Sequence, residues 1–157
     1  RYTRALARSM SNTKEVKGAN ILNNAFDSTF TFGDGKELCA TDHPTVGGGN
    51  FRNELTTSAD LNETSLEQSL IDIAAFIDER GLLVAVQGRK LVIPPALQFV
   101  AFFIKTDAPN GFKHFERSPV KTSMEGDFDT GNVRYKARER YSFGVSDPRC
   151  VFGSPGA

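Results

Sequence analysis

The chain has no tryptophan, only two cysteines and two histidines, and no long apolar run. Without such a run no segment is expected to span a membrane as a helix, because a span needs about 20 mostly apolar residues. Cys39 and Cys150 are too few for a disulfide framework and fit a reducing compartment. Lys and Arg total 19 and Asp and Glu total 19, so the net charge is zero, which argues against a dedicated nucleic-acid binder.

The length of 157 residues suits one domain with a core, or a core with an extended appendage. The chain begins at Arg1 rather than Met, so we expect a fragment or a processed product. Glycine and proline are spread along the chain, and no part is a low-complexity linker.

The most regular pattern lies at residues 133–145, which alternate strictly between two kinds of side chain. One set is apolar except for Glu139, and the other contains four cations. The cations are Arg134, Lys136, Arg138 and Arg140. Period two with aromatic and β-branched residues predicts a long strand, with one face on a core and the other in solvent or against a partner. We expect Glu139 to pair with a cation on an adjacent strand, because a carboxylate on an apolar face needs a partner.

Apolar spacing predicts two helices in the first half of the chain. Residues 2–26 form a long helix with a polar middle, which suits a surface position. Thr64 and Glu67 have the spacing of a capping box, so the second helix is expected to begin at Ser65, with Gly81 as its C-terminal cap. Its expected core stripe is Leu66, Leu70, Ile73, Ala74 and Ile77.

The second half is predicted to be mainly strands. Residues 82–86 and 91–93 are expected to form two short buried strands around a turn at 87–90. A helix at 95–101 then runs directly into a strand-like segment, so we expect a segment to be missing from the numbering between Ala101 and Phe102. Further strands are expected at 112–117 and 120–124.

Few residues suggest catalysis or metal binding. Cys39, Asp42 and His43 have the residue types of a zinc site or of a Cys/His nucleophile pair, but the chain lacks a CxxC or HExxH spacing. Gly47–Gly49 lacks the Lys and Ser or Thr of a phosphate-binding loop. We therefore predict no catalytic residue, no metal and no cofactor, and favour a protein that is not an enzyme.

The ordered set of segments resembles the major capsid protein of tailed double-stranded-DNA bacteriophages, in particular the Mu-like prophage head-subunit group. The matching segments are ILNNAF at 21–26, DG at 34–35, LCATDHP at 38–44, DERG at 78–81, KLVIPPAL at 90–97, DTGN at 129–132 and DPR at 147–149. The resemblance covers most of the chain from about residue 20, and the order of the segments makes it specific. No single motif in it is diagnostic.

This resemblance implies an α+β chain with the Hong Kong 97-like fold. Residues 1–32 would be the spine helix of the peripheral domain, and 33–101 would form the axial domain with part of the peripheral domain. Residues 102–157 would supply a return segment and the long peripheral strands. The N-terminal arm and extended hairpin loop of the family have no counterpart here, and the axial domain looks short.

The function that the resemblance implies is self-assembly into pentamers and hexamers of an icosahedral head. The expected partners are further copies of the chain, a portal, and scaffold or decoration proteins. The head would enclose double-stranded DNA without sequence-specific binding and without a membrane, after assembly in the bacterial cytoplasm. Two alternatives remain open, an encapsulin-like nanocompartment shell and a small Cys/His enzyme.

The cationic row is the candidate subunit interface. It could be a solvated face, or it could contact packaged DNA or an acidic surface. Three acids precede the strand and could pair with the row within the chain or from a neighbour: Glu125, Asp127 and Asp129. We favour contacts within the chain or between subunits, because a shell that binds its genome tightly would hinder ejection.

Overall fold

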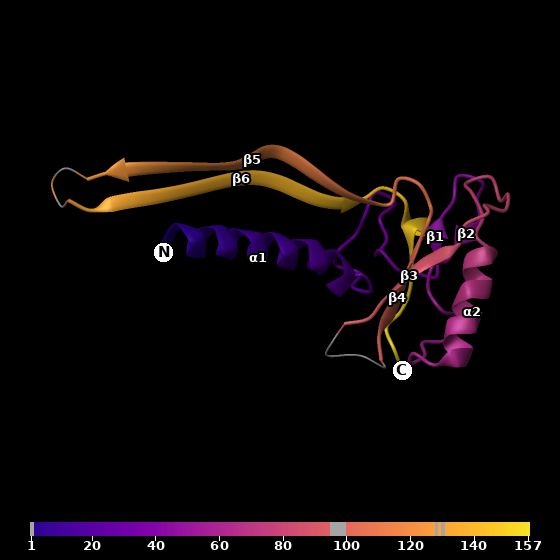
Figure 1. Ribbon diagram of the computed structural model, residues 1–157. Coiled ribbons are helices and arrows are strands. Elements are labelled where there is room, and N and C mark those ends of the chain that lie inside the picture. Colours follow the sequence, from indigo (N-terminus) through magenta and orange to yellow (C-terminus); the bar gives the residue numbers. More distant parts are fainter. Residues whose placement is uncertain (1, 95–99, 128, 130) are drawn as a thin grey trace. The chain divides into compact units, whose positions relative to one another are not determined.

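The computed structural model describes residues 2–94, 100–127, 129 and 131–157, and it is a mixed structure of helices and strands (Figure 1). Its elements, in order, are α1 (Tyr2–Asn23), β1 (His43–Pro44), β2 (Asn50–Phe51), α2 (Glu63–Ala74), β3 (Gly88–Val92), β4 (Phe102–Thr106), β5 (Phe112–Gly126), β6 (Val133–Val145), a 3₁₀ turn (Pro148–Cys150) and β7 (Val151–Ser154).

The chain divides into two compact units. Residues Arg1–Ile21 and Lys113–Gly144 form the first, which we name the helix–hairpin unit. Residues Leu22–Phe112 and Val145–Ala157 form the second, which we name the sheet unit.

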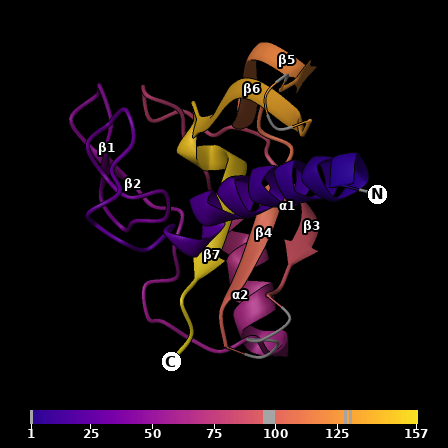
Figure 2. The same ribbon diagram turned by 90° about the vertical axis from the view of Figure 1, so that its left-hand side faces the viewer.

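The sheet unit is built around three antiparallel strands in the order β3-β4-β7 (Figure 2). Phe103 lies between Val92 of β3 and Gly153 of β7. A Cβ at Gly153 would lie 2.9 Å from the rings of Phe103 and Phe26, so only glycine lets these segments approach so closely.

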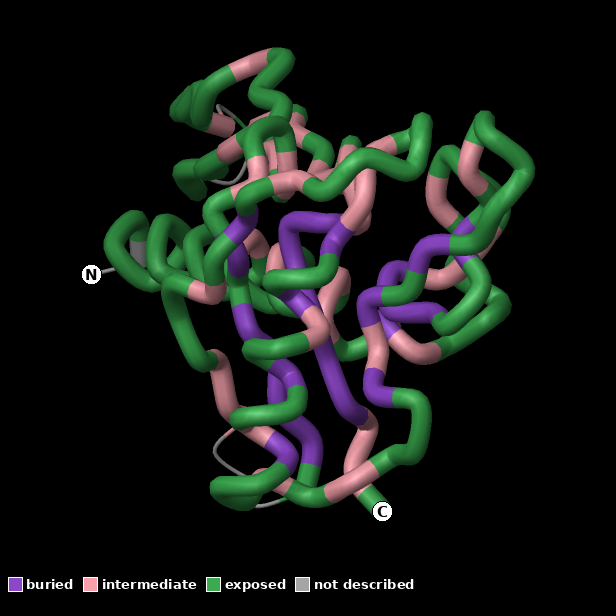
Figure 3. The backbone as a smooth tube through the Cα atoms, turned by 90° about the vertical axis from the view of Figure 1, so that its right-hand side faces the viewer, coloured by how far each residue is buried: buried purple, intermediate pink, exposed green. Residues whose placement is uncertain are grey.

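The core of the sheet unit lies between this sheet and α2, where buried backbone is concentrated in Figure 3. It consists of Phe51, Leu55, Ile73, Phe76, Val86, Phe102, Ile104 and Phe152. The rings of Phe51 and Phe76 meet edge to face with their centroids 4.8 Å apart, a preferred aromatic geometry.

The helix–hairpin unit contains α1 and the two-stranded sheet of β5 and β6, which run alongside each other in Figure 1. The ring of His114 stacks on Phe143 at a centroid distance of 4.9 Å. A Cβ at Gly18 of α1 would lie 3.5 Å from the Phe143 ring, so the helix is close to the hairpin at this point. Most residues of the unit are nevertheless exposed.

The predicted boundaries of both helices need correction. The first helix ends at Asn23, three residues early. The second begins at Glu63, because Asn62 rather than Thr64 caps it: the Asn62 side chain accepts from the backbone N–H of Ser65, and the Ser65 hydroxyl accepts from that of Asn62. Gly81 is not its cap, since the helix ends at Ala74 and Gly81 sits in a later turn with φ of +83°.

The predicted core stripe of α2 is also partly wrong. The fully buried positions of this helix are Ser65, Ser69 and Ile73. The Ser69 hydroxyl donates to the Ser65 carbonyl at 2.7 Å, so this polar pair is satisfied without water. Leu70 is 46% exposed, which removes it from the core.

The predicted hairpin at 82–93 does not form. Leu82 and Leu83 are 64% and 75% exposed, and the expected turn at 87–90 lies mostly in β3. β3 pairs with β4 instead, with Leu91 opposite Ile104. The helix expected at 95–101 falls mainly on residues 95–99, outside the described residues, and β4 begins at Phe102.

Of the two long strands at the C-terminal end, β5 is longer than predicted and β6 agrees with its prediction. The segments 112–117 and 120–124 are parts of one strand, β5, which continues through Pro119. β6 has the predicted bounds. The alternation of exposure holds from Ala137 to Phe143, whereas Val133 and Tyr135 are 50% and 47% exposed on the face expected to be buried.

Candidate interaction surface

The four cations of the predicted row lie on one side of β6. Arg134, Lys136, Arg138 and Arg140 are all exposed. The residues between them face α1: Tyr141 lies 5.1 Å below the Lys14 ammonium, and Ala137 and Tyr135 line a groove with Leu6 and Met10. Successive side chains of a strand point to opposite faces, so the four cations share the other side of β6, although Lys136 also borders the groove with α1.

The neighbouring strand β5 adds cations to this side, which the sequence analysis missed. A Cβ at Gly144 of β6 would lie 3.8 Å from the ring of Phe115, so Phe115 is on the side of the row. Arg117 and Lys121, at even spacing from Phe115, share that side and are exposed. The spacing of Lys113, Phe115, Arg117 and Lys121 was the signal available in the sequence.

We name this surface the cationic face. Its six exposed members are Arg117, Lys121, Arg134, Lys136, Arg138 and Arg140. Arg134 pairs with Asp127 at 3.3 Å, so pairing within the chain is confirmed for one of the three predicted acids. Within the described part of the chain, Glu125 and Asp129 form no ion pair with the row, and the other five cations form none.

Glu139 has a partner other than the one expected. Its carboxylate, 10% exposed, lies 3.7 Å from the ammonium of Lys14, which comes from α1 rather than from an adjacent strand. The same ammonium lies 3.8 Å from Glu116 of β5. Lys14 therefore neutralises two carboxylates where the helix meets the hairpin.

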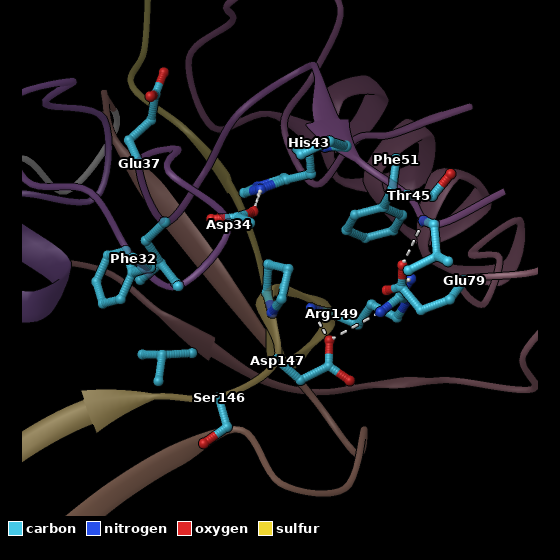
Figure 4. Close-up of a pocket in the computed structure, with 16 residues that line it drawn as sticks. Phe32, Asp34, Glu37, His43, Thr45, Phe51, Glu79, Ser146, Asp147 and Arg149 are labelled. Carbon is cyan, nitrogen blue, oxygen red and sulfur yellow. Dashed lines mark hydrogen bonds and ion pairs between the residues drawn. The ribbon is translucent and has the colours of Figure 1, made fainter. Parts of the chain in front are cut away.

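A cleft of about 860 Å³ opens in the sheet unit (Figure 4). Arg149 forms part of its wall: its guanidinium, 9% exposed, donates to Glu79 at 2.9 Å and to Asp147 at 3.3 Å. It also lies over the ring of Phe51 at 4.8 Å. Hydrogen bonds from Arg149 and from the Val46 backbone lower the pKa of Glu79, so this acid stays ionised and holds the arginine in place.

His43 occupies the inner wall of the cleft with both ring nitrogens engaged. Its Nδ1 lies 2.5 Å from Asp34 Oδ2, and its Nε2 lies 3.1 Å from Oδ1 of the buried Asn53 (Figure 4 shows the Asp34 contact). The Asn53 amide nitrogen faces the carbonyls of Leu38, Pro148 and Val151, so Oδ1 must be the atom that accepts from His43. No ring nitrogen is left to act as a base toward a molecule in the cleft.

The two cysteines are also poorly suited to catalysis. Burial raises the pKa of the Cys39 thiol well above its usual value, and Glu54 adds to this effect. Burial, with a contribution from Asp147, raises the pKa of Cys150 to about 12. A nucleophilic cysteine needs a lowered pKa, so these thiols have a structural role in the core. Cys39 does not line the cleft that His43 lines.

Gly47–Gly49 forms the turn between β1 and β2. Gly48 has φ of +82°, and the Gly47 N–H donates to the Glu79 carbonyl at 3.0 Å. The glycines therefore serve a tight turn against a neighbouring loop.

No cluster of three or more His, Cys, Asp or Glu side chains within residues 2–94, 100–127, 129 and 131–157 has an arrangement that could hold a metal ion. In the same ranges, no helix has the length and apolar character that crossing a bilayer requires. Comparisons with models of protein families, with curated proteins and with solved structures find no match to this chain.

Proposed function

We propose that the chain is a structural protein whose function is self-association, as the major capsid protein of a tailed bacteriophage. Copies form pentamers and hexamers that tile an icosahedral shell around double-stranded DNA. The order of segments that resembles this family motivates the proposal, and the exposed apolar end of the β5–β6 hairpin is the structural observation that supports it.

The apolar end of the hairpin consists of four large side chains near the β5–β6 turn. We name it the apolar tip: Val120, Met124, Val133 and Tyr135, which are 47–68% exposed. α1 covers this side of the hairpin only in part, through a groove lined by Thr3, Leu6, Ala7 and Met10. Exposed apolar side chains that gather at one place usually mark an interaction surface.

The size of the hairpin leads to the same proposal. β5 has 15 residues, which at about 3.3 Å per residue gives a length of roughly 50 Å. A two-stranded hairpin is at best marginally stable alone and needs a third strand, a helix or another surface for support. α1 supplies part of this support, and neighbouring copies supply the remainder in the proposed shell. Several modest contacts with different neighbours give a stable assembly through avidity.

Sedimentation velocity and electron microscopy of the purified chain test the proposal. Rings, shells or particles in the megadalton range are expected. Met124→Ser together with Val133→Ser reduces the assembled fraction, because it removes apolar area from the apolar tip. Val46→Ser is the matched control, since Val46 is 90% exposed in the sheet unit. A chain that stays monomeric at high concentration contradicts the proposal.

A further inference from the structure

The two units carry opposite charges of equal size. The helix–hairpin unit contains twelve of the 19 Lys and Arg residues and six of the 19 Asp and Glu residues, a formal charge of +6. The sheet unit contains the other seven cations and thirteen acids, a charge of −6. The zero net charge of the chain therefore hides a strong separation of charge.

Most acids of the sheet unit are already engaged within it. Four form ion pairs with a Lys or Arg: Asp42 with Lys36, Asp72 with Arg52, Asp107 with Arg89, and Glu79 with Arg149. The Asp34 carboxylate lies 2.5 Å from the His43 ring. Asp147 also contacts Arg149, and the carboxylates of Asp27, Asp60 and Asp78 accept backbone N–H groups. Four have no such partner in the described ranges: Glu37, Glu54, Glu63 and Glu67.

Glu63 and Glu67 differ from the other two by position. Both are exposed and both belong to α2, whereas Glu37 is partly buried and the Glu54 side chain is half-buried. With Ile71, which is 62% exposed, they follow i, i+4 and i+8 spacing and lie on one stripe of the helix. α2 contains no Lys or Arg. We name this stripe the acidic stripe.

We infer that the cationic face of one copy docks on the acidic stripe of α2 in a neighbouring copy. The inference rests on the proposed self-association and names the surfaces that meet. Five cations of the cationic face have no ion pair in the described part of the chain, and the acidic stripe has two carboxylates without one. Each surface also has an exposed apolar residue, Phe115 beside the cations and Ile71 on the stripe, so the contact removes apolar area from water.

Opposite surfaces on one chain favour a second copy over nucleic acid as the partner. A polyanion is attracted to the cationic face, but the sheet unit, at −6, repels it. A second copy brings the matching charge in equal amount. The contact is heterologous, because two different surfaces meet, and such contacts close into rings when the rotation from one copy to the next closes.

A charge-swap series tests this pairing. Arg138→Glu with Arg140→Glu, and separately Glu63→Lys with Glu67→Lys, should each weaken association by roughly tenfold or more, measured by sedimentation equilibrium. The four substitutions combined in one chain restore association, because opposite charges face each other again. Arg4→Glu with Arg8→Glu is the matched control: it changes the same charge on exposed positions of the same unit, and association falls much less, because neither arginine belongs to the cationic face. Two further controls separate loss of contact from loss of folding. Glu67→Lys alone keeps Glu63, whose charge stabilises the helix N-terminus. Thermal unfolding of every variant shows whether it is folded.

The possible outcomes are distinct. Association of both charge-reversed variants at the native strength overturns the docking inference while the proposed shell function stands. Loss of DNA retention with unchanged association assigns the cationic face to nucleic acid and also overturns the inference. A native chain that does not associate at all overturns the proposed function itself.

Discussion

Among single residues, Asn53 makes the most consequential contacts in the sheet unit. Its side chain is fully buried, and its Oδ1 accepts from the Ala40 N–H at 2.9 Å and faces His43. Its amide nitrogen lies within 3.2 Å of three carbonyls, two of which, those of Pro148 and Val151, are 95 and 98 positions away in the sequence. One side chain thus ties residues 38–43 to the C-terminal segment.

We expect Asn53→Ala to lower the free energy of unfolding by about 3 kcal/mol or more, because it leaves several buried polar groups unpaired at about 1–3 kcal/mol each. Urea denaturation followed by circular dichroism measures the loss. Asn50→Ala, at an exposed position of β2, is the control and should change stability by less than about 0.5 kcal/mol. Equal losses in the two variants would show that the hydrogen bonds of Asn53 stabilise the fold no more than an exposed asparagine does.

No local pattern around Asn53 indicated this role. His43 was singled out by residue type and Arg149 only as part of the DPR segment, and their partners Asn53, Asp34 and Glu79 lie 9–70 positions away. Such contacts depend on the tertiary fold, which brings distant loops together. The exposure of the four β6 cations, in contrast, was predicted correctly from local alternation, whereas the cations of β5 beside them were missed.

Among the elements, those with a local signal were predicted best. β6 was predicted with its bounds because alternation is a property of the segment alone. The hairpin at 82–93 failed because Gly88, Arg89 and Lys90 resemble a turn, whereas the strand they enter is fixed by pairing with β4. The start of α2 was misplaced because Asn62 and Thr64 are both good caps, and the buried hydroxyl of Ser65 selects Asn62.

The junction of α1 with the hairpin offers a test at this scale. Lys14→Met removes the charge but keeps an apolar stem, so Glu139 loses its cation in a nearly buried position. We expect a loss of about 1–3 kcal/mol in the free energy of unfolding, measured by urea denaturation. Lys17→Met is the control, because Lys17 is exposed, forms no ion pair with any described residue, and lies 5.7 Å from the centre of the Tyr141 ring. Adding Glu139→Gln to Lys14→Met should recover part of the loss, and no recovery would argue against the ion pair as its cause.

At the scale of the whole molecule, charge separation and exposed apolar area act together. In the proposed assembly, the units of +6 and −6 would give a long-range attraction between copies, and the apolar tip, Phe115 and Ile71 would add short-range contacts. Neither feature was evident from the overall composition, since the net charge is zero and the apolar residues are spread along the chain. Both became visible once the fold had assigned each residue to a unit and a face.

The two contributions respond differently to salt, which gives the last prediction. Raising the salt concentration from about 0.1 M to about 1 M shortens the Debye length from about 10 Å to about 3 Å, so the attraction between exposed charges weakens. Apolar contacts are not weakened in this way and are strengthened by sulfate. We therefore expect sodium chloride to lower the association constant and slow assembly, followed by light scattering. Ammonium sulfate at the same ionic strength should weaken association less, and Arg138→Glu with Arg140→Glu should flatten the chloride dependence. Association that strengthens steadily with sodium chloride would mean that apolar contacts alone hold the copies together.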